Sequence, residues 1–517
     1  MSNKIIAKSA SIIGIATLCS RILGFIRDVV IARLFGVYIY AQAFVVAFRI
    51  PNLLRDLVGE GATNSAFVPV FSEYTVKHTK EEFWELANVV LNFLLVVLSA
   101  ITILGIICSP VLVRLMAPGF IAEPEKLVAT IRLTRIIFPY VLLISLAAYS
   151  MGLLNSLKHF SIPAFAPCLL NISVIVCALA FGEGIAGLAS GVLIGGVLQL
   201  AVQIPVLYKK GFHPKLFKSF RHPAARAIGK LLVPRVLSSS IYQLNNFVDS
   251  IFGSLSWVVG EGGVAVLYFS YRLIQFPLGI FSNALSQAIL PALSTQALEE
   301  NHEKLKHTLT FGLRATFFVM LPAGVGLMAL SHSIIGTLFG GRKFDVYSVN
   351  ATASALFFYS IGLFAYGGTK IIQSCFFALK DTVTPTKIAG MALVVNVILN
   401  AALMFPLKIA GLALATSLSG INSFFILFFI LKKRLGDFKV KEIALSFLRI
   451  LFASIAMGLV SYLISKNIFQ GAHRLDKLLN LSISILCSLI SYVIFCFVFR
   501  VNEMQELWKW LKERRQG

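Results

Sequence analysis

Five arginines fall within the first two hydrophobic segments of a chain that is otherwise typical of a membrane protein: Arg21, Arg27, Arg33, Arg49 and Arg55. A charge at the centre of a bilayer costs at least ~2.5–3.5 kcal/mol, so such side chains usually face a cavity or a substrate path. The guanidinium group has a fixed fork of donors that binds phosphate oxygens in pairs, and it stays charged inside a protein. The pattern therefore predicts a site for an anionic substrate within the membrane.

The elements that must position these arginines are transmembrane helices. Hydrophobic residues make up 57% of the 517 residues and charged residues only 13%, which excludes an ordinary soluble domain. Continuous apolar runs, rather than alternating ten-residue segments, favour an all-α bundle over a β-barrel. We count about fourteen candidate spans, the eleventh and twelfth at 384–406 and 409–431.

The charge distribution predicts the orientation of the chain. The formal net charge is +23, and the heaviest basic loops, 209–230 and 432–441, fall on the same side as the N-terminus when fourteen spans are counted. This is the positive-inside pattern, so we expect a multi-pass membrane protein with both termini in the cytoplasm. Most of the basic excess then contacts anionic headgroups, and we expect no nucleic-acid partner.

The chain also repeats itself at an offset of about 222–224 residues. Leu157-Lys158 matches Leu379-Lys380, and residues 185–189 (IAGLA) match 409–413 (IAGLA). Six spans separate equivalent positions, so the two halves share one orientation and a pseudo-two-fold axis along the membrane normal. We expect an N-terminal lobe at 1–210, a C-terminal lobe at 211–432, an added helix pair at 433–500 and an amphipathic cytoplasmic tail at 501–517 that lies on the headgroups.

The repeat brings a further arginine into the predicted site. Arg272 occupies the position equivalent to Arg49, and opposing Arg55 with Arg272 would make a clamp of diphosphate size. The alternative is that some arginines reach to the headgroups, as we expect of Arg33, or pair with nearby acids. Those acids, Asp28, Asp56 and Glu60, are too few to neutralise every arginine. We therefore expect Arg21, Arg27, Arg55 and Arg272 to line a positive cavity, with Arg49 as support.

A second group of polar residues has the chemistry of a cation site. Asp249 lies in the seventh span, Asn396 and Asn400 lie one turn apart in the eleventh, and Thr416 lies in the twelfth. Carboxylate, amide and hydroxyl oxygens suit a hard cation such as Na⁺, and i,i+4 spacing places both asparagines on one helix face. The alternative is hydrogen bonding between helices, which is common for Asn and Thr in membrane bundles. Gly187, with glycines at 191 and 195, predicts close helix packing rather than a ligand site.

The arginine-bearing segments resemble the MurJ/MviN lipid II flippases, within the superfamily of multidrug and oligosaccharidyl-lipid exporters. The resemblance rests on 20–28 (SRILGFIRD), 43–55 (AFVVAFRIPNLLR), 59–62 (GEGA) and 66–69 (AFVP), and it extends over nearly the whole chain. It implies that Arg21, Arg27, Arg55 and Arg272 are cavity arginines and that Asp28, Arg49 and Glu60 are charged positions nearby. It also implies a Na⁺ site that includes the carbonyl of Leu412, and a polyprenyl-tail groove in the last two spans. Gln42 and Gln275 stand where some members carry acids.

The resemblance implies a non-enzymatic function. We expect a flippase that moves the undecaprenyl-diphosphate-linked peptidoglycan precursor (lipid II) to the outer leaflet by alternating access, for cell wall synthesis. We expect it to work in a bacterial cytoplasmic membrane, as a monomer among membrane lipids without a cofactor, other than Na⁺ as a coupling ion. The alternative is a cation-coupled exporter of small molecules, or of another polyprenyl-linked oligosaccharide. A polytopic glycosyltransferase or phosphatase would need acidic or nucleophilic groups clustered at one membrane face, and a scaffold would leave the arginines without a purpose.

Overall fold

The computed structural model describes residues 3–55, 67–182, 184–215, 244–245, 247–299, 302–467, 473–506 and 508, without the side chains of 3–10, 50, 54 and 55. The regular elements in these ranges are helices, and no strand occurs among them. The chain divides into two compact units. The first contains 1–256, 261–265 and 342–344, and the second contains 257–260, 266–341 and 345–517.

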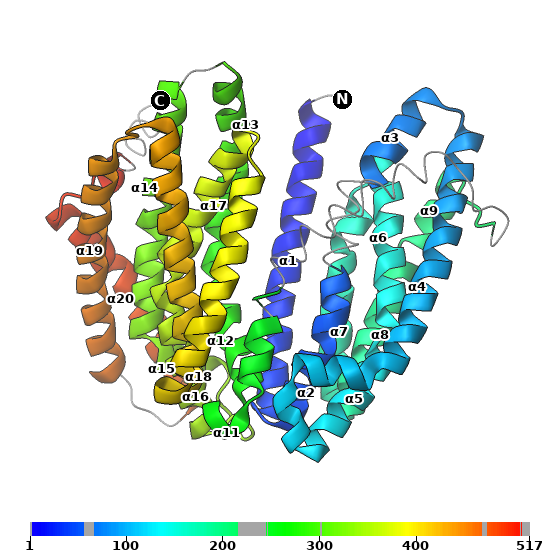
Figure 1. Cartoon of the computed structure of the whole chain (residues 1–517), viewed down its shortest axis with the longest axis horizontal. Helices are drawn as coiled ribbons and strands as arrows, with labels where there is room; N and C mark the ends of the chain where they lie inside the picture. The colour runs from blue at the N-terminus through cyan, green and yellow to red at the C-terminus, as the bar shows by residue number, and fades with distance from the viewer. Residues whose placement is uncertain are drawn as a thin grey trace. The chain divides into compact units, whose positions relative to one another are not determined.

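The first unit is a bundle in which α7 packs on both α8 and α1, while α2 packs on α5 (Figure 1). Its helices are α1 (Asn3–Phe35), α2 (Ile39–Arg55), α3 (Val68–Lys77), α4 (Lys80–Met116), η2 (Pro118–Ala122), α5 (Pro124–Ile137), α6 (Tyr140–Ser156), α7 (Ser161–Phe181), α8 (Ile185–Ala201) and α9 (Ile204–Lys210). α4 begins with a capping box: the Thr79 hydroxyl accepts from the backbone N–H of Glu82, and the Glu82 carboxylate accepts from that of Thr79. A further helical stretch covers 247–253.

The second unit is built around α14 and α17, with α19 packed on α14 and α20 packed on α19 (Figure 1). The helices from residue 256 onward, which except for 256, 263–265 and the loop at 342–344 belong to this unit, are α11 (Ser256–Val259), α12 (Gly263–Pro277), η3 (Leu278–Ser282), α13 (Asn283–Leu298), α14 (His302–Ala329), α15 (Ser331–Leu338), α16 (Val346–Ile361), α17 (Leu363–Ala378), α18 (Val383–Leu435), α19 (Val440–Asn467) and α20 (Arg474–Val498). Leu309, Phe317 and Phe424 belong to its hydrophobic core.

The described helices include nine that are long and apolar enough to cross a membrane, or ten when α16 and α17, bent by 43°, are taken as one broken span. This confirms the all-α membrane fold. α18 contains two of the predicted spans, because its backbone leaves the helical region at Lys408 (φ 52°), between 384–406 and 409–431. The exact number of fourteen stays a prediction, since most of the seventh predicted span lies outside the described residues.

The element boundaries repeat at the offset that the sequence predicts. α5 and α6 correspond to α16 and α17, and α7 begins at Ser161 as α18 begins at Val383. Lys158 and Lys380, 222 positions apart, both adopt a left-handed backbone (φ 61° and 59°) immediately after α6 and α17. In each case the following N–H bonds back to the carbonyl five residues earlier, which is the Schellman ending of a helix. The internal duplication is therefore visible in the local structure.

The glycines of α8 confirm the predicted close packing. A Cβ at Gly191 would lie 2.8 Å from Cα of Val174 in α7, and one at Gly195 would lie 2.9 Å from Cα of Leu170. The short approach also allows the Ser173 hydroxyl to donate to the carbonyl of Gly191 at 2.7 Å. The close packing of α7 on α8 thus requires glycine, which has no side chain, at these positions of α8.

Candidate functional site

Arg27 is buried and paired within the first unit. Its side chain is 7% exposed, and both Nε and Nη2 donate to Oδ1 of the fully buried Asp28, at 3.0 and 2.7 Å. Nη1 donates to Oδ1 of Asn171 in α7 at 3.1 Å, and the guanidinium carbon lies 5.9 Å from the centre of the Phe48 ring. Burying a charge costs free energy unless it is paired and hydrogen-bonded, and here Asp28 and Asn171 meet that need.

The other predicted arginines of the first unit differ in exposure. Arg21, near the middle of α1, has an exposed side chain, whereas Arg33 and Arg49 are half-buried. Nη1 of Arg49 donates to the hydroxyl of Ser250, a residue of the 247–253 stretch. Arg55 is the last residue of α2, but its side chain lies outside the described part, as does the whole of Glu60.

In the second unit the predicted arginine is accompanied by a neutral partner. Arg272 of α12 is half-buried, and its Nη1 lies 3.4 Å from Oε1 of Gln275. Gln275 carries no charge, so this contact is a neutral one. The cavity between arginines from both halves stays a prediction, as does the pairing of Arg55 with Arg272.

Two residues of interest were missed by the sequence analysis. Asn171 holds Arg27, and the amide nitrogen of the same side chain donates to the carbonyl of Ser20 at 3.1 Å. Lys370 is an exposed lysine within α17, a helix that is otherwise free of formal charge. Its signal was present in the sequence, because a lone lysine inside an apolar span is as unusual as the arginines. Asn171 gave no such signal, since a single asparagine in a span is common.

Four of the five predicted cation ligands, all but Asp249, form one connected chain of hydrogen bonds in the second unit. Nδ2 of Asn400 donates to Oδ1 of Asn396 at 3.0 Å, and Nδ2 of Asn396 donates to Oγ1 of Thr416 at 3.2 Å. The Thr416 hydroxyl then donates to the carbonyl of Leu412 at 3.1 Å. Asp249 is half-buried and belongs to the first unit, so its relation to this group stays a prediction.

Comparison with known proteins decides the family. Residues 31–483 match the model of the family described as "Lipid II flippase MurJ". The chain belongs to the MurJ family. It is 32% identical over 507 residues to the "Probable lipid II flippase MurJ" of Buchnera aphidicola subsp. Acyrthosiphon pisum, covering 96% of this chain and 98% of that protein. It is 34% identical to the "Lipid II flippase MurJ" of Burkholderia cenocepacia, with 81% and 82% covered.

Solved structures agree with membership of the MurJ family. A "Lipid II flippase MurJ, inward closed conformation" superposes with a TM-score of 0.80 at 29% identity, covering 95% of this chain and 99% of that one. An inward-facing multidrug resistance transporter of the MATE family, in the MOP superfamily, gives a TM-score of 0.67 at 17% identity, covering 81% and 95%. The second likeness shows a shared fold, as the resemblance implied for the superfamily.

Proposed function

We propose that the chain is a lipid II flippase that carries the polyprenyl-diphosphate-linked peptidoglycan precursor from the inner to the outer leaflet of the bacterial cytoplasmic membrane. The observation that carries this proposal is membership of the MurJ family over nearly the whole chain. The exposed Arg21 in the middle of α1 and the half-buried Arg272 supply groups suited to a diphosphate. The protein acts as a monomer, without catalytic chemistry and without nucleic acid.

The empty carrier keeps Arg27 neutralised by Asp28, because a buried guanidinium with no anion would be costly. A diphosphate that reaches α1 competes with Asp28 for the same donors, while Arg21, Arg55 and Arg272 add charge around it. A membrane potential that is negative inside favours outward movement of an anion by ~2.3 kcal/mol per charge per 100 mV. The lobes then rock so that the headgroup becomes accessible outside, while the isoprenoid tail stays in lipid along α19 and α20.

Both termini lie in the cytoplasm in this proposal. The basic residues Lys432, Lys433 and Arg434 at the end of α18 then face the inner surface, as the positive-inside pattern requires. Labelling of single cysteines placed at 433 and at 474, on either side of α19, tests this orientation. An impermeant reagent added to intact cells should label only the cysteine at 474, and the reverse result would contradict this orientation.

We further propose Na⁺ as the coupling ion, held by Asp249, Asn396, Asn400, Thr416 and the carbonyl of Leu412. The donor set fits, since Oδ1 of the fully buried Asn400 accepts no hydrogen bond within the described part of the chain. When bound, the ion supplies positive charge that neutralises Asp249 and favours one state of the empty carrier. Sodium-independent transport in the wild type, unchanged in Asp249→Ala and Asn400→Ala, would contradict this proposal.

The flippase proposal is tested by complementation of a bacterium depleted of its own flippase, scored by outward accessibility of lipid II. Arg21→Ala, Arg55→Ala and Arg272→Ala should each lower accessibility strongly at normal membrane levels of protein. Arg474→Ala, which removes an exposed arginine at the start of α20, is the matched control and should act as wild type. Normal flipping by all three variants would overturn the arginine site, and export of cationic small molecules without any lipid II movement would favour the alternative exporter.

A further inference from the structure

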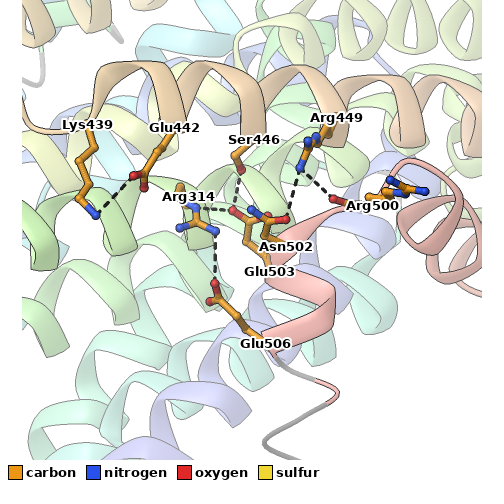
Figure 2. Close-up of polar contacts among 9 residues, drawn as sticks. All are labelled: Arg314, Lys439, Glu442, Ser446, Arg449, Arg500, Asn502, Glu503 and Glu506. Carbon is orange, nitrogen blue, oxygen red and sulfur yellow. Dashed lines mark hydrogen bonds and ion pairs between the residues drawn. The ribbon is translucent and has the colours of Figure 1, made fainter.

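The segment that follows α20 is held to α14 and α19 by a polar cluster, which Figure 2 shows. Oε1 of Glu503 accepts from Nε of Arg314 at 2.5 Å and from the Ser446 hydroxyl at 2.6 Å. Glu506 adds a longer contact, 3.5 Å, to Nη2 of Arg314. We call Arg314, Ser446 and Glu503 the clasp. Glu503 and Glu506, the acids after α20 in the described part of the chain, are therefore already engaged by Arg314.

Two arginines beside the clasp pair with no acid among the residues that the structure describes. Nη1 of Arg449 donates to the carbonyl of Arg500 at 3.1 Å and to Oδ1 of Asn502 at 3.3 Å, so both of its partners are neutral (Figure 2). Its Nε and Nη2 make no hydrogen bond within the described residues. Arg500 has an exposed side chain that contacts no acid in the same part of the chain. Glu442 lines the same small hollow as Arg449, but its carboxylate pairs with Lys439 at 3.4 Å.

An aromatic pair adjoins the two arginines, with one ring on α19 and the other in the turn after α20. Phe452 lies one turn after Arg449 in α19, and Phe499 immediately precedes Arg500. Their rings stack with centroids 6.2 Å apart and planes 28° apart, although 55% of Phe452 and 37% of Phe499 are exposed. We call Arg449, Arg500, Phe452 and Phe499 the α19–α20 corner. Within the described residues it combines two arginines that pair with no acid and an exposed apolar surface, between the first half of α19 and the turn after α20. Both α19 and α20 are candidate membrane spans.

We propose that the α19–α20 corner binds the phosphate of an anionic glycerophospholipid in the leaflet on the C-terminal side of α20, with the acyl chains against Phe452 and Phe499. Arginine binds phosphate oxygens through two parallel donors, and the free donors of Arg449 and Arg500 are available for this. A soluble polyanion would have no use for the exposed aromatic pair, whereas a lipid uses both features. The proposal goes beyond lipid II transport and does not depend on it.

The bound lipid also strengthens the clasp. Arg449 holds the carbonyl of Arg500 and the side chain of Asn502, the two residues that lead into Glu503. A phosphate that is bound by both arginines adds a second tie between α19 and the turn after α20, and so stabilises this turn. The added helix pair is then held to α14 more firmly in a membrane that contains anionic lipid.

The test measures lipid binding by the full-length protein rather than transport. Purified protein in neutral detergent is titrated with phosphatidylglycerol or phosphatidylcholine, and both the thermal unfolding midpoint and the lipids retained in native mass spectrometry are recorded. The wild type should be stabilised by phosphatidylglycerol at a lower mole fraction than by phosphatidylcholine. Arg449→Gln/Arg500→Gln should need about tenfold more phosphatidylglycerol for the same shift and should retain one lipid fewer.

Two further variants keep the experiment decisive. Arg500→Gln alone removes an exposed side chain, leaves the fold intact, and should weaken the response several-fold. Arg474→Gln at the opposite end of α20 is the control and should match wild type. Equal phosphatidylglycerol responses in Arg500→Gln, the double variant and Arg474→Gln would overturn the proposal. So would an equal wild-type response to phosphatidylcholine, or a shift reproduced by inorganic phosphate alone, which would indicate a site for free anions.

Discussion

Oδ1 of Asn171 in α7 accepts a hydrogen bond from Nη1 of Arg27 in α1, 3.1 Å away, while the amide nitrogen of the same side chain donates to the carbonyl of Ser20. Ser20 lies four residues before Gly24 and Arg27 lies three residues after it. One side chain of α7 therefore holds α1 on both sides of a glycine. Any movement of Arg27 toward a substrate must break a bond to α7, so Asn171 couples the arginine to the backbone that carries it.

Replacing Asn171 should therefore weaken both stability and transport. Asn171→Leu leaves Nη1 of Arg27 and the Ser20 carbonyl without their partner, and we expect a loss of about 1–3 kcal/mol. Thermal unfolding in detergent measures the loss, and the lipid II accessibility assay measures transport. Asn467→Leu is the control, because among the described residues that exposed side chain bonds only to the carbonyl of Leu463 in its own helix. Equal unfolding midpoints and equal lipid II accessibility for the two variants would show that the hydrogen bonds of Asn171 contribute to neither stability nor transport.

Asp28 should contribute to stability mainly as the counter-ion of Arg27. Asp28→Leu leaves a buried guanidinium without its carboxylate, which costs about 3–5 kcal/mol. Arg27→Leu/Asp28→Leu removes both charges, so much of that stability should return while transport stays low. Unfolding midpoints of the single and double variants, measured beside lipid II accessibility, separate the structural role of the pair from its role in binding. Transport that returns together with stability in the double variant would exclude Arg27 from the substrate site.

The packing of α8 on α7 makes Gly191 intolerant of a side chain. A Cβ there meets Cα of Val174 at 2.8 Å, so Gly191→Leu must separate the helices and should cost about 1–3 kcal/mol or more. Gly14→Leu in α1 is the matched control, because no described atom of another helix lies within 4 Å of the added Cβ. Unfolding midpoints in the same detergent provide the comparison. A larger loss for the Gly14 variant would contradict the packing described here.

Asp381, in the loop before α18, gives the chain a pH-dependent contact outside the membrane. The backbone N–H of Thr384 lowers the pKa of this carboxyl most; burial opposes this, but the Thr384 hydroxyl and Arg434 also lower the pKa, so the net shift is downward. A lowered folded pKa stabilises the folded state above the ordinary value of 3.8, and the contribution is lost as pH falls through the folded pKa. Asp381→Asn should therefore show a smaller drop in unfolding midpoint between pH 5 and about pH 2 than wild type. Parallel midpoint curves for the two proteins would contradict this.

Periodicity and composition were sufficient to predict the helical membrane fold, the repeat and the packing glycines. These features depend on local pattern: an apolar run long enough to span, and small residues four apart. The repeat was found from Leu157-Lys158 and Leu379-Lys380, and the structure explains why those residues match, since both pairs end a helix in the same left-handed turn. A signal that sets local backbone geometry can be read from one sequence.

The contacts of the candidate site could not be predicted in the same way. Arg27 pairs with Asp28, an alternative that the sequence left open, and with Asn171, which is 144 residues distant along the chain. Whether Arg27 also lines a cavity stays a prediction. Charge and spacing identify an unusual arginine, but they do not say which side chain from another helix will reach it. Gln275 beside Arg272 was noticed only as a departure from the family pattern, and the structure places it in contact with that arginine.

All five non-glycine residues with positive φ in the described chain are basic: Lys158, Lys380, Lys408, Lys439 and Arg500. Glycine would adopt this backbone with less strain, whereas an L-residue pays about 1–2 kcal/mol. Lys158, Lys380 and Arg500 follow the ends of α6, α17 and α20, where a cation faces the negative end of the helix dipole. In each of these three turns a single side chain combines two roles: its residue takes the strained backbone that ends the helix, and it places a positive charge at the carboxyl end of that helix. Replacing Lys158 or Lys380 with glycine would therefore relieve the backbone strain and remove the charge in one substitution.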